Sequence, residues 1–329
     1  MVNVFVLGAT GFIGGAVARH LLAEGHLVRG LARSHAASKK LQAAGVEPVS
    51  GDLQAGLAAL VRAAAQHDVV VVAAQLEPRT ELAVVTALLD ALDGTGKTLL
   101  FTSGSGVLLQ RSEGSWSPDT FTEDDEFRVE PLAETRRTVE NLVRSGVHRG
   151  VRGMVVRAGM VWGPGDHGHV SLIYRSVGVL GAAAYVGEGL NVYSHVHVDD
   201  VARLFSLANR RGAPGALYHA VAGETPMRWI AESVAADLGV ATRSLNPSEA
   251  VEVWGEFDAL LIGASSRIRA RRSRRELGWA PTRTDLLDTV GERRLRALAK
   301  HKESEVRSGP HRSTPPSRHS RPRVRPGLP

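Results

Sequence analysis

Short apolar runs alternate with amphipathic segments through the first half of the chain. Strand-like runs rich in β-branched residues occur at 2–7, 26–32, 46–50, 68–74, 97–103 and 151–157. Segments with helical spacing of apolar residues lie between them, near 12–24, 34–44, 54–66, 77–93 and 131–147. Strands joined by helical crossovers indicate α/β architecture with a parallel, doubly wound sheet. The near-continuous apolar run at 69–74 agrees, because a central parallel strand is covered by helices on both faces.

The pattern is less regular beyond residue 158. A Gly-rich loop is followed by a predicted helix near 169–180, by shorter elements, and by a predicted final helix at 282–300. We expect a dinucleotide-binding Rossmann core at 1–157 and a small, mostly helical substrate lobe at 158–300, interleaved with the core. The polar segment 104–130 is long enough for a loop to suggest a function.

The last part of the chain, 301–329, differs in composition from the rest. Residues 306–329 contain six Arg and no acidic residue, and without them basic and acidic side chains are equal at 34 each. A segment rich in Pro, Ser and Arg buries too little apolar surface to fold, which predicts a disordered basic tail. The alternative is an arm for nucleic acid or a membrane surface, but we expect neither partner.

Overall composition is typical of a soluble globular protein, with 43% hydrophobic and 22% charged residues. Cysteine is absent, which excludes disulfides and thiolate metal sites and suits a cytoplasmic protein. Apolar runs stay shorter than the ~18 residues of a membrane helix, and the N-terminus lacks the basic region of a signal peptide. A homodimer stays open as the oligomeric state.

The strongest motif is VFVLGATGFIGGAV at 4–17, which reads as a strand, a tight turn and a helix. Gly8 permits the turn, Gly11 lets a pyrophosphate approach the backbone, and Gly14 lets the helix pack closely on the strand. The free N–H groups at the start of the helix then favour phosphate. This order of elements predicts a dinucleotide site.

The residues after the second strand indicate which dinucleotide is bound. An acidic residue there would bind the ribose hydroxyl of NAD, whereas this chain has Arg33 and Ser34, with Lys39 and Lys40 following. A guanidinium suits a 2′-phosphate in charge and geometry, so we predict NADP(H) rather than NAD(H). The alternative is that Arg33 only covers exposed surface.

Further motifs accompany the glycine turn: GDL (51–53), DVVVVAA (68–74), LLFTSGS (99–105), VVRAGMVWGPG (155–165), HVDDVARL (197–204) and RRELGWAP (274–281). Together they resemble the short-chain dehydrogenase/reductase superfamily, in its extended and atypical branch of NAD-dependent epimerase/dehydratase-like proteins, over about residues 2–300. The resemblance implies a Rossmann domain with a small C-terminal substrate lobe, and no metal. It implies cofactor contacts from Gly8, Thr10, Gly11, Phe12, Ile13, Gly14, Arg33, Ser34, Asp52, Leu53, Ala73, Ala74, Thr102, Arg136, Ala158 and Met160.

The usual catalytic residues of that superfamily are a Ser or Thr after the fifth strand and the Tyr and Lys of Y-x-x-x-K. Aligned on Glu140, the Tyr place falls on Leu132 and the Lys place on Arg136, while the Ser place falls on Gly104. Leu132 cannot pass a proton, and we interpret it as a packing residue. Arg136 is no base near neutral pH, but it can hold the nicotinamide ribose or a phosphate.

Other residues must therefore supply the chemistry, if there is any. Ser103 and Ser105 flank the vacated Ser place and are candidates to orient a carbonyl, and Tyr193 is a candidate phenol from the small lobe. Candidates for substrate contact are Trp162, His167, His169 and Tyr193. Each of these has an ordinary alternative as a buried or loop residue. His195 and His197 lie on one side of a predicted strand, but no third metal ligand is evident.

Three functions remain open at this point. The leading one is an NADPH-dependent reductase of a small carbonyl or enone metabolite, of the kind found in secondary metabolism. The second is a redox-neutral epimerase, dehydratase or cyclase, and the third is a non-catalytic NADP(H)-binding sensor.

We expect deletion of residues 306–329 to leave the melting temperature and cofactor affinity unchanged, because this segment carries charge but almost no apolar surface. Thermal melts and cofactor titrations of the full and shortened chains measure both. A large fall in melting temperature after truncation would show that the segment docks on the rest of the protein.

Overall fold

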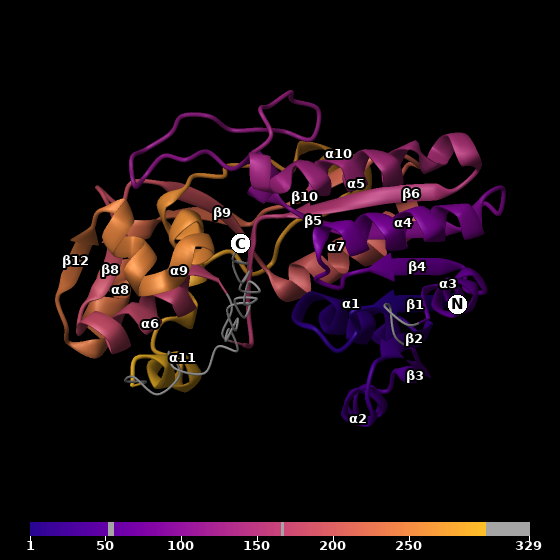
Figure 1. Ribbon diagram of the computed structural model, residues 1–329, viewed down its shortest axis with the longest axis horizontal. Helices are drawn as coiled ribbons and strands as arrows, with labels where there is room; N and C mark the ends of the chain where they lie inside the picture. Colours follow the sequence, from indigo (N-terminus) through magenta and orange to yellow (C-terminus); the bar gives the residue numbers. More distant parts are fainter. Residues whose placement is uncertain (52–55, 166–167, 301–329) are drawn as a thin grey trace, which may run out of the picture.

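The computed structural model describes residues 1–51, 56–165 and 168–300 of the 329. Its largest element is a seven-stranded, entirely parallel sheet in the order β10-β6-β5-β4-β1-β2-β3 (Figure 1). Its strands are β1 (Asn3–Leu7), β2 (Leu27–Ala32), β3 (Glu47–Ser50), β4 (Val69–Val72), β5 (Thr98–Gly104), β6 (Arg152–Ala158) and β10 (Leu217–Ala220). The α/β fold class is confirmed, and β10 adds a seventh strand that the sequence pattern did not reveal.

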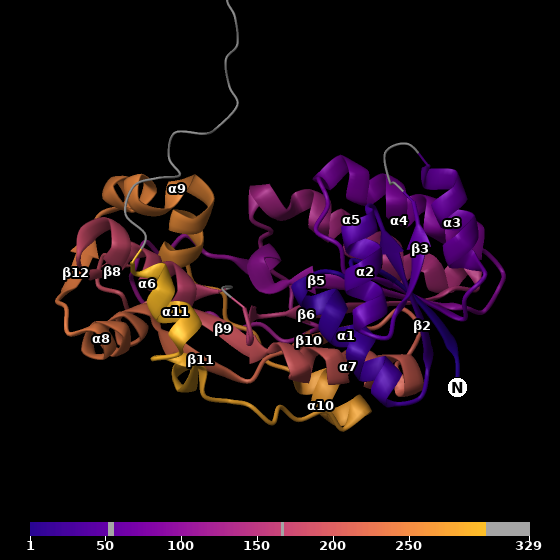
Figure 2. The ribbon, with the colours of Figure 1, turned by 90° about the horizontal axis from the view of Figure 1, so that it is seen from below.

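Helices cover both faces of the sheet (Figure 2). One layer contains α1 (Phe12–Ala23), α2 (His35–Ala43), α7 (Val198–Arg211) and α10 (Arg271–Leu277). The other contains α3 (Leu57–Ala65), α4 (Pro78–Leu92) and α5 (Glu134–Ser145). Strand side chains alternate between the two cores: Val4 and Val6 pack with the first layer, Phe5 and Leu7 with the second. All four residues of β4 are buried, as expected of a central parallel strand.

The small lobe has its own core, formed by helices around two short sheets. The helices are α6 (His169–Leu180), α8 (Met227–Leu238), α9 (Pro247–Gly263) and α11 (Arg293–Leu298). One sheet has the order β11-β9-β7, formed by Gly223–Pro226, Val192–His197 and Met160–Trp162; the other pairs β12 (Thr242–Leu245) with β8 (Ala183–Val186). Between these elements the chain returns to the large sheet as α7, β10 and α10, so the second half contributes to both cores.

Two predicted helices are divided differently in the structure. The segment 131–147 forms the 3-10 turn η2 (Pro131–Ala133), then α5, then the 3-10 turn η3 (Gly146–Arg149). The single helix predicted at 282–300 is wrong, because η4 (Leu286–Thr289) and α11 are separate. Gly291 lies between them with a φ of 90°, which no right-handed helix contains.

The long polar loop after β5 is docked rather than free. It begins with the 3-10 turn η1 (Ser105–Leu108), and then Gln110 and Phe121 form bridges with Ser265 and Ile268. The Glu123 carboxylate accepts hydrogen bonds from backbone N–H groups at the start of α10. The segment 265–277 is therefore extended where it meets this loop and helical only in α10.

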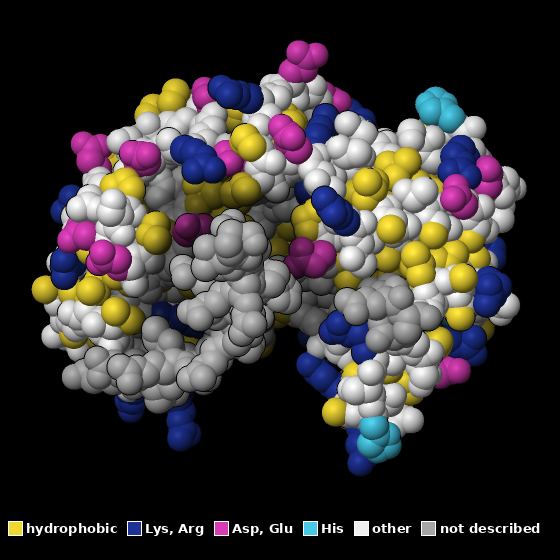
Figure 3. Space-filling model, in the orientation of Figure 1, with side chains coloured by type: hydrophobic (Ala, Val, Ile, Leu, Met, Phe, Trp, Pro, Cys, Tyr) yellow, Lys and Arg dark blue, Asp and Glu magenta, His cyan; other side chains and the backbone are white. Residues whose placement is uncertain are grey.

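The carboxyl ends of the parallel strands face the small lobe, and the surface is hollowed between the two parts (Figures 1 and 3). Ligands of doubly wound sheets bind outside this edge. Within the described ranges no helix combines the length and apolarity of a bilayer crossing.

Candidate active site

The glycine turn closes tightly against the end of β4. Gly8 has a φ of 90°, and a Cβ there would lie 2.6 Å from both the carbonyl oxygen of Ala73 and the amide nitrogen of Ala74. A Cβ on Gly14 would clash with the Gly8 carbonyl oxygen, and the Gly11 N–H donates to that oxygen at 2.8 Å. Only glycine fits these close approaches. The resulting concave backbone at the start of α1 fits a pyrophosphate.

A basic side chain of α2 contacts this turn on the side where we expect the adenine half of the cofactor. The Lys40 ammonium donates to the Thr10 carbonyl oxygen at 2.7 Å and so fixes the turn from α2. Ser34 caps α2 by accepting from the Ala37 N–H at 3.1 Å. Arg33 is exposed directly after β2. Asp52 and Leu53, predicted to contact the cofactor, lie outside the described residues.

At the end of β5 the two candidate serines face different neighbours. Ser103 is buried beside Glu140, whose carboxylate accepts from the Arg157 Nε at 2.9 Å. Burial raises the pKa of Glu140, but the Arg157 guanidinium outweighs burial and leaves that pKa lowered. Ser103 therefore belongs to a buried charged network. Ser105 lies on the other side of the chain turn, with Tyr193.

Arg136 on α5 contacts both α4 and the end of β5, and so it links three elements. Its Nε lies 3.0 Å from the Glu81 Oε2 on α4, and its Nη1 donates to the Thr102 carbonyl oxygen at 3.0 Å. The guanidinium also stacks 5.5 Å from the centre of the Phe101 ring. Burial raises the pKa of Glu81, and the positive charge of Arg136 offsets that effect only in part. Thr102, predicted as a cofactor contact, thus also anchors Arg136.

Tyr193 on β9 brings a phenol to the carboxyl end of β5. The side chain is 4% exposed, and burial raises the pKa of the phenol while the hydroxyls of Ser105 and Ser266 act in the opposite direction. A Cβ on Gly106 would meet only the Tyr193 hydroxyl, at 3.4 Å, and a Cβ on Gly104 would meet nothing closer than 3.9 Å. The missing side chain at Gly106 therefore leaves space beside the phenol.

Three imidazoles lie close to Trp162, between β9 and α6. The rings of His197 and Trp162 meet edge to face with centroids 4.6 Å apart, and His169 meets Tyr193 at 5.1 Å. Burial lowers the pKa of His169 to about 3 and that of His195 to about 4, and it also lowers the pKa of His197. All three rings are therefore uncharged at neutral pH.

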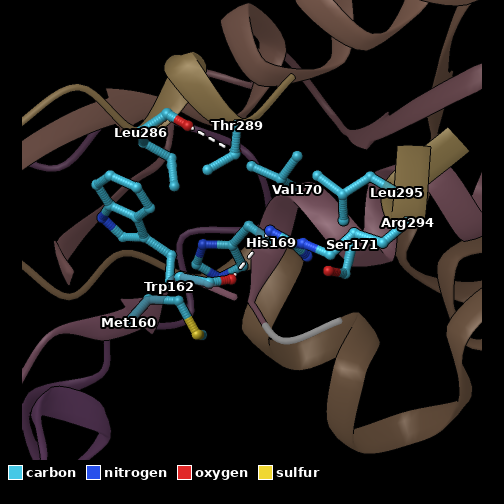
Figure 4. Close-up of a pocket in the computed structure, with 10 residues that line it drawn as sticks. Met160, Trp162, His169, Val170, Ser171, Leu286, Thr289, Arg294 and Leu295 are labelled. Carbon is cyan, nitrogen blue, oxygen red and sulfur yellow. Dashed lines mark hydrogen bonds between the residues drawn. The ribbon is translucent and has the colours of Figure 1, made fainter. Parts of the chain in front are cut away.

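A small cavity of about 10 Å³ lies between this cluster and the segment that contains η4 and α11 (Figure 4). Trp162 and His169 line it on one side, and Leu286, Thr289 and Arg294 line it on the other. A space of this size holds about one water molecule. The substrate contacts predicted for Trp162 and His169 stay predictions, and His167 lies outside the described residues.

The remaining predicted cofactor residues follow from the strand ends. Ala158 ends β6 opposite Gly104, and Met160 starts β7 opposite His195. Phe12 and Ile13 are the half-buried first residues of α1. Together with the glycine turn they outline a continuous edge from α1 to β6. In the described part of the chain, no three carboxylate or imidazole side chains are grouped for a metal ion.

Comparison with known proteins identifies the family to which this fold belongs. The model of the NAD dependent epimerase/dehydratase family matches residues 4–221. The chain belongs to this family. Its members are NAD(P)-dependent oxidoreductases, epimerases and dehydratases of the extended short-chain dehydrogenase/reductase type, so this epimerase/dehydratase-family chain is an enzyme of that type, and the resemblance seen in its motifs is confirmed.

Individual relatives cover most of the chain. An uncharacterized protein of Schizosaccharomyces pombe is 34% identical over 87% of this chain and 97% of its own length. A 4-hydroxy-2-methyl-3-oxo-4-farnesyl-3,4-dihydroquinoline-1-oxide ketoreductase of Stigmatella aurantiaca is 26% identical over 84% of this chain and 92% of its own. The crystal structure of dTDP-glucose 4,6-dehydratase from Bacillus anthracis with NAD superposes with a TM-score of 0.68, at 18% identity, over 91% of this chain and 96% of that one.

Measured against the family pattern, the start of α5 lacks a proton donor. Leu132 is 67% exposed in η2, so it is not the packing residue that its position suggested. In both ribbon views the start of α5 and helix α9 lie on opposite sides of the gap between the two parts of this family member (Figures 1 and 2). Leu132 therefore offers an apolar surface and no chemistry.

Two residues near this site, Glu81 and Gly106, were not predicted from the sequence. Glu81 stands in an amphipathic helix outside any motif, and its burial only becomes visible once α4 packs on α5. Gly106 follows Ser105 in FTSGSG, where its closeness to a tyrosine 87 positions later has no local signal. The only indication in the sequence of a space beside Tyr193 was that glycine occurs twice around the end of β5, at 104 and 106.

We expect acid to destabilise this protein through its buried imidazoles. An unfolded His takes up a proton near pH 6.5, whereas folded His169 resists until about pH 3, so its contribution to stability is complete above 6.5 and lost as pH falls. The free energy of unfolding should decline by about 1.4 kcal/mol per pH unit for each such imidazole.

Urea unfolding at several pH values between 7 and 4 measures this slope. His169→Gln should remove one imidazole's share of it, whereas substitution of the exposed His148 should leave it unchanged. Equal slopes for wild type and His169→Gln would show that His169 titrates normally in the folded protein.

Proposed function

We propose that the chain is an NADPH-dependent reductase of a small carbonyl or enone compound with an apolar body. The observation that carries this proposal is the phenol of Tyr193 beside Ser105, next to the space left by Gly106. A carbonyl oxygen placed in that space would meet two hydroxyl donors. The family's usual Ser and Tyr provide the same pair of functions from other positions.

Cofactor binding follows from the turn and from the strand ends. Bound NADPH supplies the hydride. The backbone of Gly8 to Gly14 holds the pyrophosphate, and Arg33 pairs with the 2′-phosphate, for which a charged fork of donors is suited. Arg136 directs a positive charge toward the nicotinamide half from below β5.

Proton transfer falls to Tyr193. Its raised pKa keeps the phenol protonated at neutral pH, so it can donate a proton to the oxygen of the reduced carbonyl. The Ser105 hydroxyl then donates to the phenolate that is left and stabilises it, while the Ser266 hydroxyl donates to the Ser105 carbonyl oxygen at 2.7 Å. Ser105 also orients the substrate oxygen before reaction.

The polarity of the surroundings supports an apolar substrate. The imidazoles of His169, His195 and His197 are uncharged, so none of them pairs with an anionic group. Leu132 on η2 and Phe257 on α9 are exposed at 67% and 63%, and in both ribbon views the start of α5 and helix α9 lie on opposite sides of the gap between core and lobe. The Stigmatella relative is named for reducing a 3-oxo compound with a farnesyl chain, which is chemistry of this kind.

Cofactor preference provides one test. We expect wild type to bind NADPH at least about tenfold more tightly than NADH, because the Arg33 guanidinium pairs with the 2′-phosphate. Arg33→Asp should reverse the order, since a carboxylate repels phosphate and accepts from the ribose hydroxyl. Fluorescence titration of both cofactors measures this, and a wild type that prefers NADH contradicts the assignment.

The proton donor provides a second test, with NADPH oxidation followed over a panel of alkyl 3-oxo esters and enones. Tyr193→Phe should lower kcat by about 100-fold or more and leave NADPH affinity unchanged. Gly106→Ala should also lower kcat/KM, because its Cβ fills the space 3.4 Å from the phenol oxygen.

Tyr185→Phe is the matched control, since Tyr185 is a buried tyrosine of the same lobe that stacks on Arg228. It should keep full activity and the same melting temperature. A Tyr193→Phe variant that reduces the panel as fast as wild type would show that another group donates the proton.

A further inference from the structure

The most unusual charged group near the site is the carboxylate of Glu81. It lies on the first turn of α4 and is 1% exposed, below the edge where the cofactor is expected. Its Oε2 pairs with the Arg136 Nε at 3.0 Å, while its Oε1 is buried and accepts no hydrogen bond from the described residues. A carboxylate with one unsatisfied oxygen is expensive to bury.

Stability alone does not explain this pair. A buried ion pair contributes about as much as well-packed apolar residues of the same volume, so a leucine and a methionine would hold α4 on α5 equally well. The pair does fix the orientation of the Arg136 guanidinium. Glu81 holds the Nε edge of the guanidinium and the Thr102 carbonyl oxygen holds Nη1.

These two contacts fix two points of the guanidinium, and a contact on its face sets the plane. The Phe101 ring, 5.5 Å from the guanidinium carbon, supports one of its faces. The remaining nitrogen, Nη2, forms no hydrogen bond with any described residue, and the Arg136 side chain is 31% exposed. Glu81 and Thr102 therefore leave available the two N–H groups of Nη2 and the second N–H group of Nη1.

We propose that Glu81 is a positioning residue: it locks Arg136 so that Nη2 donates to an oxygen of the nicotinamide half of the dinucleotide. This rests on the proposed cofactor role of Arg136. Glu81 itself is too deeply buried to touch a ligand, so it acts only through Arg136. The neutral isostere Gln would still fit between α4 and α5 but would hold the guanidinium less firmly.

The test is a double-mutant cycle on the full chain with Glu81→Gln, Arg136→Met and the double variant, read out as NADPH and NADH dissociation constants and melting temperature. Arg136→Met should weaken binding of the preferred cofactor about tenfold or more. Glu81→Gln should weaken it about threefold to tenfold, with little loss of stability. Arg136→Lys should recover part of the affinity.

The double variant separates positioning from general damage. If Glu81 acts only through Arg136, the double variant should bind cofactor as Arg136→Met does, without a further loss. Its melting temperature should exceed that of Arg136→Met, because the neutral amide removes the unpaired buried charge. Glu123→Gln, a buried glutamate bonded to α10, is the matched control and should leave cofactor affinity unchanged.

Unchanged affinity in Glu81→Gln, or losses that multiply in the double variant, would overturn the inference. The readout is binding, so it is independent of turnover. A chain that binds NADPH but reduces no carbonyl would contradict the proposed function, and the cycle would still decide the role of Glu81.

Discussion

The ion pair between Arg136 and Glu81 ties together the three elements that meet at the end of β5. The carboxylate is held by α4, the guanidinium by α5, and the Thr102 carbonyl oxygen by β5. Because the buried Glu81 carboxylate is costly to leave unpaired, removing Arg136 alone would weaken the contact of these three elements. The end of β5 that these contacts hold leads directly into Ser105, and so it positions the candidate active site.

A carbonyl reductase must deliver a proton beside the carbon that accepts hydride, and in this chain α5 cannot do so. Leu132 replaces the usual tyrosine and lies exposed to solvent, while Arg136 is paired with Glu81. In the proposed arrangement the phenol moves to β9, and glycine at 106 makes room for it. This proposal keeps the family scaffold and takes the acid from the other lobe.

Fold and cofactor turn could be read from the sequence because their signals are local. Periodicity located six strands, and the spacing of Gly8, Gly11 and Gly14 described the turn that the structure shows. Tyr193 and Ser105 were separate candidates, and their contact was not predicted, since the residues are 88 positions apart. Burial of Glu81 and the break of the last helix at Gly291 depend on packing and backbone angles that periodicity does not encode.

Net hydride transfer is the central claim, and isotope transfer measures it most directly. The protein would be incubated with NADPH carrying deuterium at both hydrogen positions of nicotinamide C4 and with an alkyl 3-oxo ester, and the product analysed by mass spectrometry and NMR. We expect one deuterium at the new carbinol carbon for each NADPH oxidised, and none in the Tyr193→Phe variant on the same timescale. Product formation without deuterium, or a substrate changed while NADPH is not consumed, would contradict reduction and favour redox-neutral chemistry on this scaffold.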